Sequence, residues 1–175
     1  EAERLGMILD VSHLNDTGFS DVIKFSKRPF IASHSNSRSL CPVARNLTDE
    51  QIKELASRGG VIGLNNMLNF VFPKKQGQDS SAKPIPSVEL PEGKEPYEGL
   101  LDHAQHIVDL VGSDHLGFGF DLCEFEKAEE DRNLSIFRTY RHTLPFIDAV
   151  KRKFSKEISD KILWSNWMRI IDLLH

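Results

Sequence analysis

Four polar side chains each follow directly after a short apolar stretch: His13, His34, Asn65 and Asp121. In parallel α/β folds, functional groups gather where the strands end, so these four are candidates for one site. Two neutral imidazoles from neighbouring strands can bind one metal ion with a carboxylate from a later strand across it, a set that suits Zn²⁺. Such a metal activates water near neutral pH, while an unligated carboxylate carries protons to the leaving group. For either histidine alone, hydrogen-bonded packing is the alternative reading. Because three strand ends would converge on one barrel mouth, we predict His13 and His34 as zinc ligands and Asp121 as the catalytic carboxylate.

Two further residues are candidates for substrate binding. Arg45 lies between the second apolar stretch and a capped helix, where its planar guanidinium could clamp a substrate carboxylate through two hydrogen bonds. A solvated surface arginine is the alternative reading. Asn65, at the end of the third apolar stretch, is predicted to contact the substrate as well.

Other histidines and serines have simpler explanations. His103 and His106 share one helical face at a spacing known from metal sites, but they fall within a helix, which favours packing roles. Four serines around His34 lack a G-x-S-x-G nucleophile motif, so we interpret them as loop polarity: Ser33, Ser35, Ser37 and Ser39.

Strands and helices that alternate along the chain would position these groups. Apolar runs predict four buried strands, at Leu5–Ser12, Pro29–Ser33, Val61–Asn65 and His115–Phe120. Helices are predicted from the cap formers at 15–17 to near Pro29, from a Thr48–Gln51 capping box to Gly59, over Tyr97–Val111, over Phe137–Phe154, and from Ser155 onward. The pattern predicts parallel β/α units. Four of them could form a small open sheet or half of an eight-stranded barrel, and the pattern leaves both open.

Composition predicts one globular domain over residues 1–175, with a long polar loop at about 73–96. The chain has 175 residues, 39% of them hydrophobic, and a net charge of -4, which gives no electrostatic footprint for nucleic acid. No apolar run approaches the ~20 residues that cross a bilayer. Cys41 and Cys123 are too few for a disulfide framework, so two free thiols and a cytoplasmic location are favoured. Because the first residue is not Met, a processed or truncated start stays open.

Six short motifs in order give the chain a family resemblance. They are DVSH at 10–13, SHS at 33–35, ARN at 44–46, DHAQHI at 102–107, GFGFD at 117–121 and NWMRI at 166–170. Together they resemble the second half of the renal or membrane dipeptidase family, the M19 metallopeptidases.

The resemblance implies a binuclear zinc dipeptidase on a (β/α)8 barrel. By its motifs, His13 and His34 bind one zinc, Asp121 lies beside the bridging water, and Arg45 anchors the dipeptide carboxylate. The family's other zinc ligands, an H-x-D pair and a bridging glutamate, belong upstream of this chain, as does a substrate-contacting histidine. The chain is therefore expected to be a C-terminal half that is inactive alone and needs the N-terminal half, or a second copy, to close the barrel.

Departures from the family pattern keep other functions open. Phe70 falls where similar dipeptidases often have a tyrosine, while Phe120 and Ser165 replace residues that are commonly glycine. One alternative is a non-catalytic α/β module that binds a ligand or partner. Another is a different metal-dependent amide or lactone hydrolase on the same scaffold.

Overall fold

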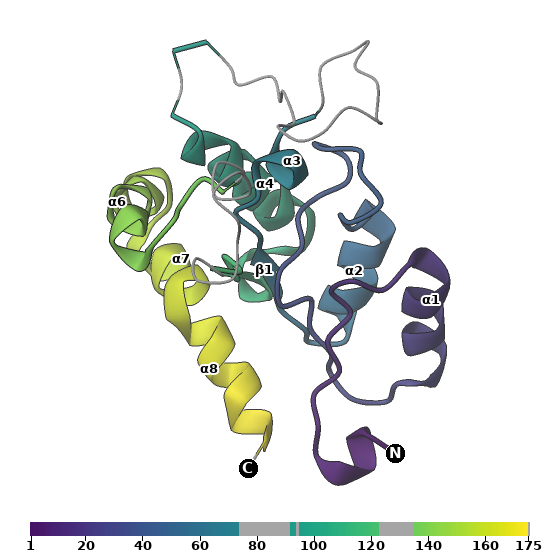
Figure 1. Cartoon of the computed structure of the whole chain (residues 1–175). Coiled ribbons are helices and arrows are strands. Elements are labelled where there is room, and N and C mark those ends of the chain that lie inside the picture. Colours follow the sequence, from purple (N-terminus) through teal and green to yellow (C-terminus); the bar gives the residue numbers. More distant parts are fainter. Residues whose placement is uncertain (74–91, 94, 123–134, 175) are drawn as a thin grey trace.

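Two short parallel strands lie in the middle of the molecule, with α1 and α2 on one side and α6 and α7 on the other (Figure 1). The computed structural model describes residues 1–73, 92–93, 95–122 and 135–174. Its elements are η1 (Glu3–Leu5), α1 (Asp16–Phe25), α2 (Asp49–Ser57), β1 (Ile62–Leu64), α3 (Leu68–Val71), α4 (Tyr97–Val111), η2 (Ser113–His115), β2 (Leu116–Phe118), η3 (Tyr140–Thr143), α6 (Leu144–Lys153), α7 (Lys156–Asp160), the π-helical η4 (Lys161–Ser165), α8 (Asn166–Ile171) and η5 (Asp172–Leu174).

Two extended segments continue the sheet beyond β1. Strands β1 and β2 pair in parallel, with Gly63 opposite Gly117. Single parallel bridges join Ala32 to Ile62 and Asp10 to Ile31. The four segments therefore lie side by side in chain order and run in one direction.

The predicted strands Leu5–Ser12 and Pro29–Ser33 are wrong as continuous strands. The first predicted strand begins in the helix η1 and a left-handed turn at Gly6. In both predicted strands, the strand pairing is limited to the isolated bridges just described. The carboxylate of Asp10 accepts the backbone N–H groups of Ser12 and Ser33, both at 2.9 Å, so these groups do not continue a ladder. The predictions for 61–65 and 115–120 are confirmed in their central residues, as β1 and β2.

The helix predictions depend on end signals, and most of these are confirmed. Thr48 and Gln51 form the predicted capping box at the start of α2, and α4 covers Tyr97–Val111 as predicted. Ser155 caps α7, which continues through η4 into α8. The region predicted as one helix, Phe137–Phe154, instead contains η3 followed by α6, whose first turn holds a proline.

The two faces of the sheet differ in the size of their side chains. One face contributes Ile62, Leu64 and Leu116 to a core shared with the helices. On the other face, a Cβ at Gly63 would lie 2.9 Å from the Trp167 ring, and a Cβ at Gly117 would overlap the same ring. Glycine is needed at Gly117 because α8 packs directly against the strand backbone, and at Gly63 because a Cβ would also overlap the carbonyl oxygen of Ser33.

Helix α8 also holds the beginnings of the two strands. Arg169 donates to the carbonyl oxygens of Gly59 and Asp114, each at 2.7 Å. Asn166, which is buried, donates to those of Ser113 and Leu116, also at 2.7 Å. These bonds satisfy carbonyl groups at the strand starts that the sheet itself leaves without donors.

Two sequence predictions fall partly outside the described residues. The polar loop at about 73–96 is described only at its ends and at 92–93, and Cys123 lies in an undescribed stretch. Within the described ranges, no helix is long and apolar enough to cross a membrane.

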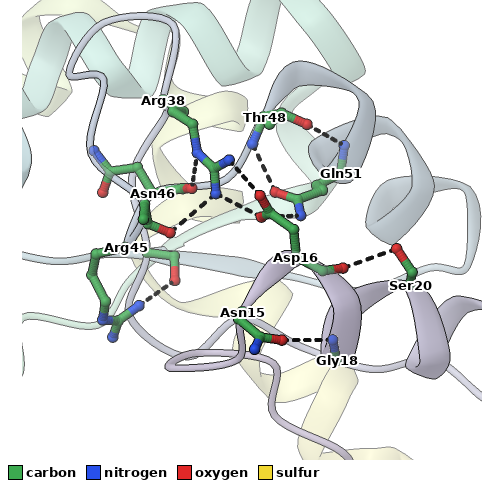
Figure 2. Close-up of polar contacts among 11 residues, drawn as sticks. Asn15, Asp16, Gly18, Ser20, Arg38, Arg45, Asn46, Thr48 and Gln51 are labelled. Atoms are coloured by element: carbon green, nitrogen blue, oxygen red, sulfur yellow. Dashed lines mark hydrogen bonds and ion pairs between the residues drawn. The ribbon is translucent and has the colours of Figure 1, made fainter.

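An ion-pair cluster joins the start of α1 to the loop that contains Arg45 (Figure 2). Arg38 donates to both carboxylate oxygens of Asp16, at 2.8 and 2.9 Å, and to the carbonyl oxygen of Asn46 at 2.8 Å. Gln51 of the capping box donates to Asp16 at 3.0 Å. The loop 38–46 is thereby fixed against α1 and α2.

We expect Arg38→Met to raise the pKa of Asp16. Hydrogen bonds from Arg38, and secondly from Gln51, lower that pKa to about 2. Because the pKa is lowered by folding, the pair stabilises the chain above the unfolded value of about 3.9 and loses that effect as the pH falls towards 2. NMR titration of Asp16 should show the rise, whereas Arg4→Met, which removes the partner of Glu1, should leave it unchanged. An unchanged Asp16 pKa in Arg38→Met would contradict this assignment.

Cys41 should resist alkylation in the folded chain. The side chain is fully buried and unpaired, and burial raises the pKa of its thiol to about 11. Since the thiolate is the reactive form, only about one molecule in a thousand would carry it at pH 8. Peptide mapping after iodoacetamide should show modification at least about 100 times slower than in urea. Equal rates in both conditions would show that Cys41 is accessible.

Candidate active site

The two histidines predicted as metal ligands lie together at the ends of adjacent segments. Their Nε2 atoms are 2.9 Å apart and their ring centroids 4.9 Å apart. His13 has a φ of 74°, in the left-handed region that non-glycine residues rarely adopt. The backbone at His13 is therefore held in an unfavourable conformation while its ring faces His34, a combination common at functional sites.

A chain of hydrogen bonds contacts His34 at Nδ1, on the side of the ring away from His13. Its Nδ1 lies 2.7 Å from Ser33 Oγ, which in turn donates to Asp10. Burial lowers the pKa of His34; Arg45 adds to this effect, and the charges of Asp121 and Asp10 oppose it. The ring is thus favoured in its neutral form, which is the form that binds metals.

Asp121 and His34 line the same cavity. Its volume is about 400 Å³, and its lining consists of Ser33, His34, Phe118, Gly119, Phe120, Asp121, Leu122 and Tyr140. Asp121 has a φ of 53°, so this site contains a second non-glycine residue in the left-handed region. Within the described ranges, no three or more His, Cys, Asp or Glu residues lie close enough to hold a metal ion. The two histidines therefore form a pair, with Asp121 beside the cavity next to them.

Arg45 is held beside the histidine pair and is not a freely solvated side chain. It donates to Ser35 Oγ and to the carbonyl oxygen of His34, each at 3.1 Å, and lies over the Phe70 ring at 5.7 Å. Burial lowers its pKa, with Asp121 and Asp10 opposing that effect. Its Nε–H is buried and has no hydrogen-bond partner among the described residues. The guanidinium is therefore positioned by the loop and retains an unused donor.

Asn65 is buried at the end of β1. Its side-chain oxygen accepts from the Met67 N–H at 2.7 Å, and its Nδ2 is without a partner in the described part of the chain. Only 1% of the residue is exposed, so its observed contacts are structural. A role in substrate binding stays a prediction.

His103 has the packing role that the sequence favoured, whereas His106 bonds a carboxylate. His103 is buried, accepts from the Ser37 N–H at 3.1 Å and contacts the Val71 carbonyl oxygen at 3.0 Å. Burial lowers its pKa to about 4. His106 instead pairs with Asp49 at 2.9 Å. The two rings thus have different partners.

Sequence reasoning missed the polar network around the histidines. Asp10, Ser12, Ser33 and Ser35 were not candidates, although the DVSH and SHS motifs contain all of them. Ser12 Oγ accepts from the His34 N–H at 3.0 Å and lies 3.2 Å from Ser35 Oγ. These serines therefore connect the two motifs, a role that loop polarity does not describe.

The sequence profile of the membrane dipeptidase family, peptidase family M19, matches residues 1–174. This chain belongs to that family. Among proteins similar in sequence, an uncharacterized protein from the pqqA 5' region of Klebsiella pneumoniae is 28% identical over 98% of this chain and 56% of its own length. Dipeptidase ataJ of Aspergillus terreus is 30% identical over 95% of this chain and 36% of its own.

Solved M19 structures share the fold. A dipeptidase described as an M19 metallopeptidase matches with a TM-score of 0.71 at 29% identity, over 99% of this chain and 45% of its own. A Rhodobacter sphaeroides metallopeptidase, solved with a phosphinate mimic of the dipeptide L-Ala-D-Ala, matches with a TM-score of 0.72 at 29% identity, over 99% and 44%. The chain thus has a mixed α/β fold like that of M19 dipeptidases and spans about half their length. Membership supports a metal-dependent peptidase at the level of the family.

Proposed function

We propose that this chain is the C-terminal half of a (β/α)8-barrel zinc dipeptidase and that His13 and His34 supply two ligands to one zinc. The observation that carries the proposal is their Nε2–Nε2 distance of 2.9 Å at the ends of adjacent parallel segments. On a tetrahedral zinc with Zn–N bonds of about 2.05 Å, two nitrogens lie about 3.3 Å apart, so a small movement of the rings would admit the ion. The donor set therefore fits the metal.

The other site residues have complementary roles in peptide hydrolysis. Zinc, when bound, supplies Lewis-acid activation of water near neutral pH. Asp121, beside the cavity, takes the proton from the attacking water and returns it to the leaving amine. Arg45 pairs with the carboxylate of the dipeptide, and Asn65 contributes its unused amide donor nearby. Phe118 and Phe120 line the cavity and limit access of bulk water.

Segment order supports half of a barrel over an open doubly wound sheet. Four neighbouring parallel segments in chain order are typical of a (β/α)8 barrel, whereas doubly wound sheets reverse their order at a switch point. This chain covers 44–45% of the length of the matched M19 structures, which agrees with half of such a fold. An N-terminal half, or a second copy of the chain, would complete it.

The test is zinc-dependent dipeptide hydrolysis by the chain alone and after co-expression with the N-terminal half of an M19 dipeptidase. We expect zinc to co-purify with the complex and dipeptides to be cleaved by it, with activity lost on chelation. Asp121→Asn should abolish cleavage in the complex while zinc content is unchanged. A stable complex that contains no zinc and cleaves no dipeptide would refute the proposed function.

Arg45→Ala is expected to raise the KM of the complex for dipeptides by about 10- to 100-fold, because a charge-assisted bidentate pair contributes about 1.5–3 kcal/mol. Dipeptide amides, which lack the carboxylate, should show little change. Arg58→Ala is a suitable control, since Arg58 donates to backbone carbonyls of Ser26 and Ile23 away from the cavity. An equal loss for dipeptides and their amides would contradict carboxylate recognition and favour a different amide or lactone hydrolase.

A non-catalytic binding module is the second candidate. It is favoured by the absence, within the described residues, of any cluster of three potential metal ligands. Exposed apolar side chains at Trp164, Met168 and Ile171 form a stripe along η4 and α8 that could bind a partner. If the chain forms a tight dimer that neither binds zinc nor accepts an N-terminal half, this candidate is preferred.

A further inference from the structure

The strongest unassigned feature is the row of polar groups behind His34. Ser33 Oγ lies between Asp10 Oδ2 and His34 Nδ1. A serine hydroxyl has one proton and can donate only once, so the identity of the acceptor fixes the direction of both hydrogen bonds.

Asp10 is the acceptor of that proton. Although burial raises its pKa, hydrogen bonds from the Ser33 hydroxyl and from the N–H groups of Ser33 and Ser12 outweigh burial and bring the pKa below its usual value. The group is a carboxylate at neutral pH, and a carboxylate only accepts. Ser33 therefore donates to Asp10, and its oxygen must accept from His34.

It follows that His34 has its proton on Nδ1 and a lone pair on Nε2. That lone pair faces His13, whose own Nε2 then donates across the 2.9 Å between the rings when no metal is bound. His13 is the exposed partner of the two, so its ring is the one free to change tautomer when a metal enters.

We propose that Asp10 and Ser33 are positioning residues that lock His34 in the Nδ1–H tautomer, with Nε2 presented to a cation before any cation arrives. The part of this inference that concerns metal affinity rests on the proposed function; the tautomer itself does not. Second partners of this kind on metal-binding histidines typically change metal affinity by about 10- to 100-fold.

Asp10→Asn gives a test that a merely structural role would not pass. Both backbone N–H groups bond Asp10 Oδ1, whereas the Ser33 hydroxyl bonds Oδ2. An asparagine can therefore keep its oxygen on the N–H groups and place its NH₂ against Ser33. That NH₂ donates, so Ser33 would have to turn its proton towards His34, and His34 would change to the Nε2–H tautomer.

The measurement is a long-range ¹H–¹⁵N correlation of the imidazoles in the metal-free chain at neutral pH. We expect His34 to show Nδ1–H in the unaltered chain and Nε2–H in Asp10→Asn, and Ser33→Ala to lose the single tautomer. Asp49→Asn is the matched control, because Asp49 also contacts a histidine, His106, but lies outside this network. It should leave the His34 signals unchanged.

Zinc affinity is measured by competition with a chromophoric chelator. It should fall about 10-fold or more in Asp10→Asn and in Ser33→Ala. Ser33→Thr, which keeps the hydroxyl, should retain the wild-type affinity. Wild-type His34 in the Nε2–H form, or an Asp10→Asn variant with an unchanged tautomer, would overturn the proposal. If the metal-free chain shows the expected tautomer but its complex with the N-terminal half binds no zinc, the proposed metal function is refuted and the tautomer lock is left intact.

Discussion

Replacing Gly119 by alanine is expected to destabilise the chain by about 3 kcal/mol, the upper part of the range for inserting an atom into a packed region. A Cβ at this position would lie 2.9 Å from the carbonyl carbon of Ser33 and overlap its oxygen. The obstacle is backbone, which cannot rotate away as a side chain can. Either the residues that follow β2 or the segment before His34 must move, and the cavity that both line would be deformed.

Chemical denaturation followed by circular dichroism measures this loss directly. Gly18→Ala is the matched control, because Gly18 is within α1 and the nearest atom to its new Cβ is a side-chain oxygen of Asn15 at 3.3 Å. Its effect should be within about 1 kcal/mol, since alanine favours helix over glycine by that amount. If Gly119→Ala is as stable as wild type, the close approach of Gly119 to Ser33 is incorrect.

Replacing His34 by alanine is expected to lower zinc affinity by about 100-fold or more, because one of two neighbouring ligand nitrogens is removed. The effect should exceed that of either positioning residue, since Ser33 and Asp10 act only through the ring. Equilibrium dialysis with elemental analysis gives the affinity, and circular dichroism confirms that the variant is folded.

His142→Ala is the control for nonspecific binding by histidine. His142 is exposed in η3 and is not part of the pair at His13 and His34. Its removal should leave zinc affinity unchanged. An equal loss in both variants, or none in His34→Ala, would show that the metal does not bind at the predicted pair.

Local signals in the sequence predict the helices α2 and α4 well. The box at Thr48 and Gln51 places the start of α2, and apolar periodicity gives both ends of α4. These predictions succeed because capping and one-sided burial depend on residues three or four apart. The rule that functional groups follow strand ends also predicted that His13 and His34 share one site. In the structure their Nε2 atoms lie 2.9 Å apart.

Features that depend on distant partners could not be predicted in the same way. The hydrogen bond between Asp10 and Ser33 joins residues that are 23 apart in the chain. Nothing in the sequence indicates that the Asp10 carboxylate accepts backbone N–H groups that would otherwise pair with a neighbouring strand. For the same reason the first two strands are shorter than their apolar runs suggest. The prediction of one helix over Phe137–Phe154 was wrong for a local reason. Pro145 fits the first turn of a helix better than its interior, and α6 begins one residue before it.

The anchoring of the strand starts by α8 has a consequence for synthesis on the ribosome. Asn166 reaches back 50 residues to Leu116, and Arg169 reaches back 110 residues to Gly59. A chain emerging from its N-terminus makes β1 and β2 long before the side chains that fix them exist. The two strands therefore have unsatisfied carbonyl groups in the interval between their synthesis and that of α8, and we expect this interval to be when the nascent chain most needs a chaperone.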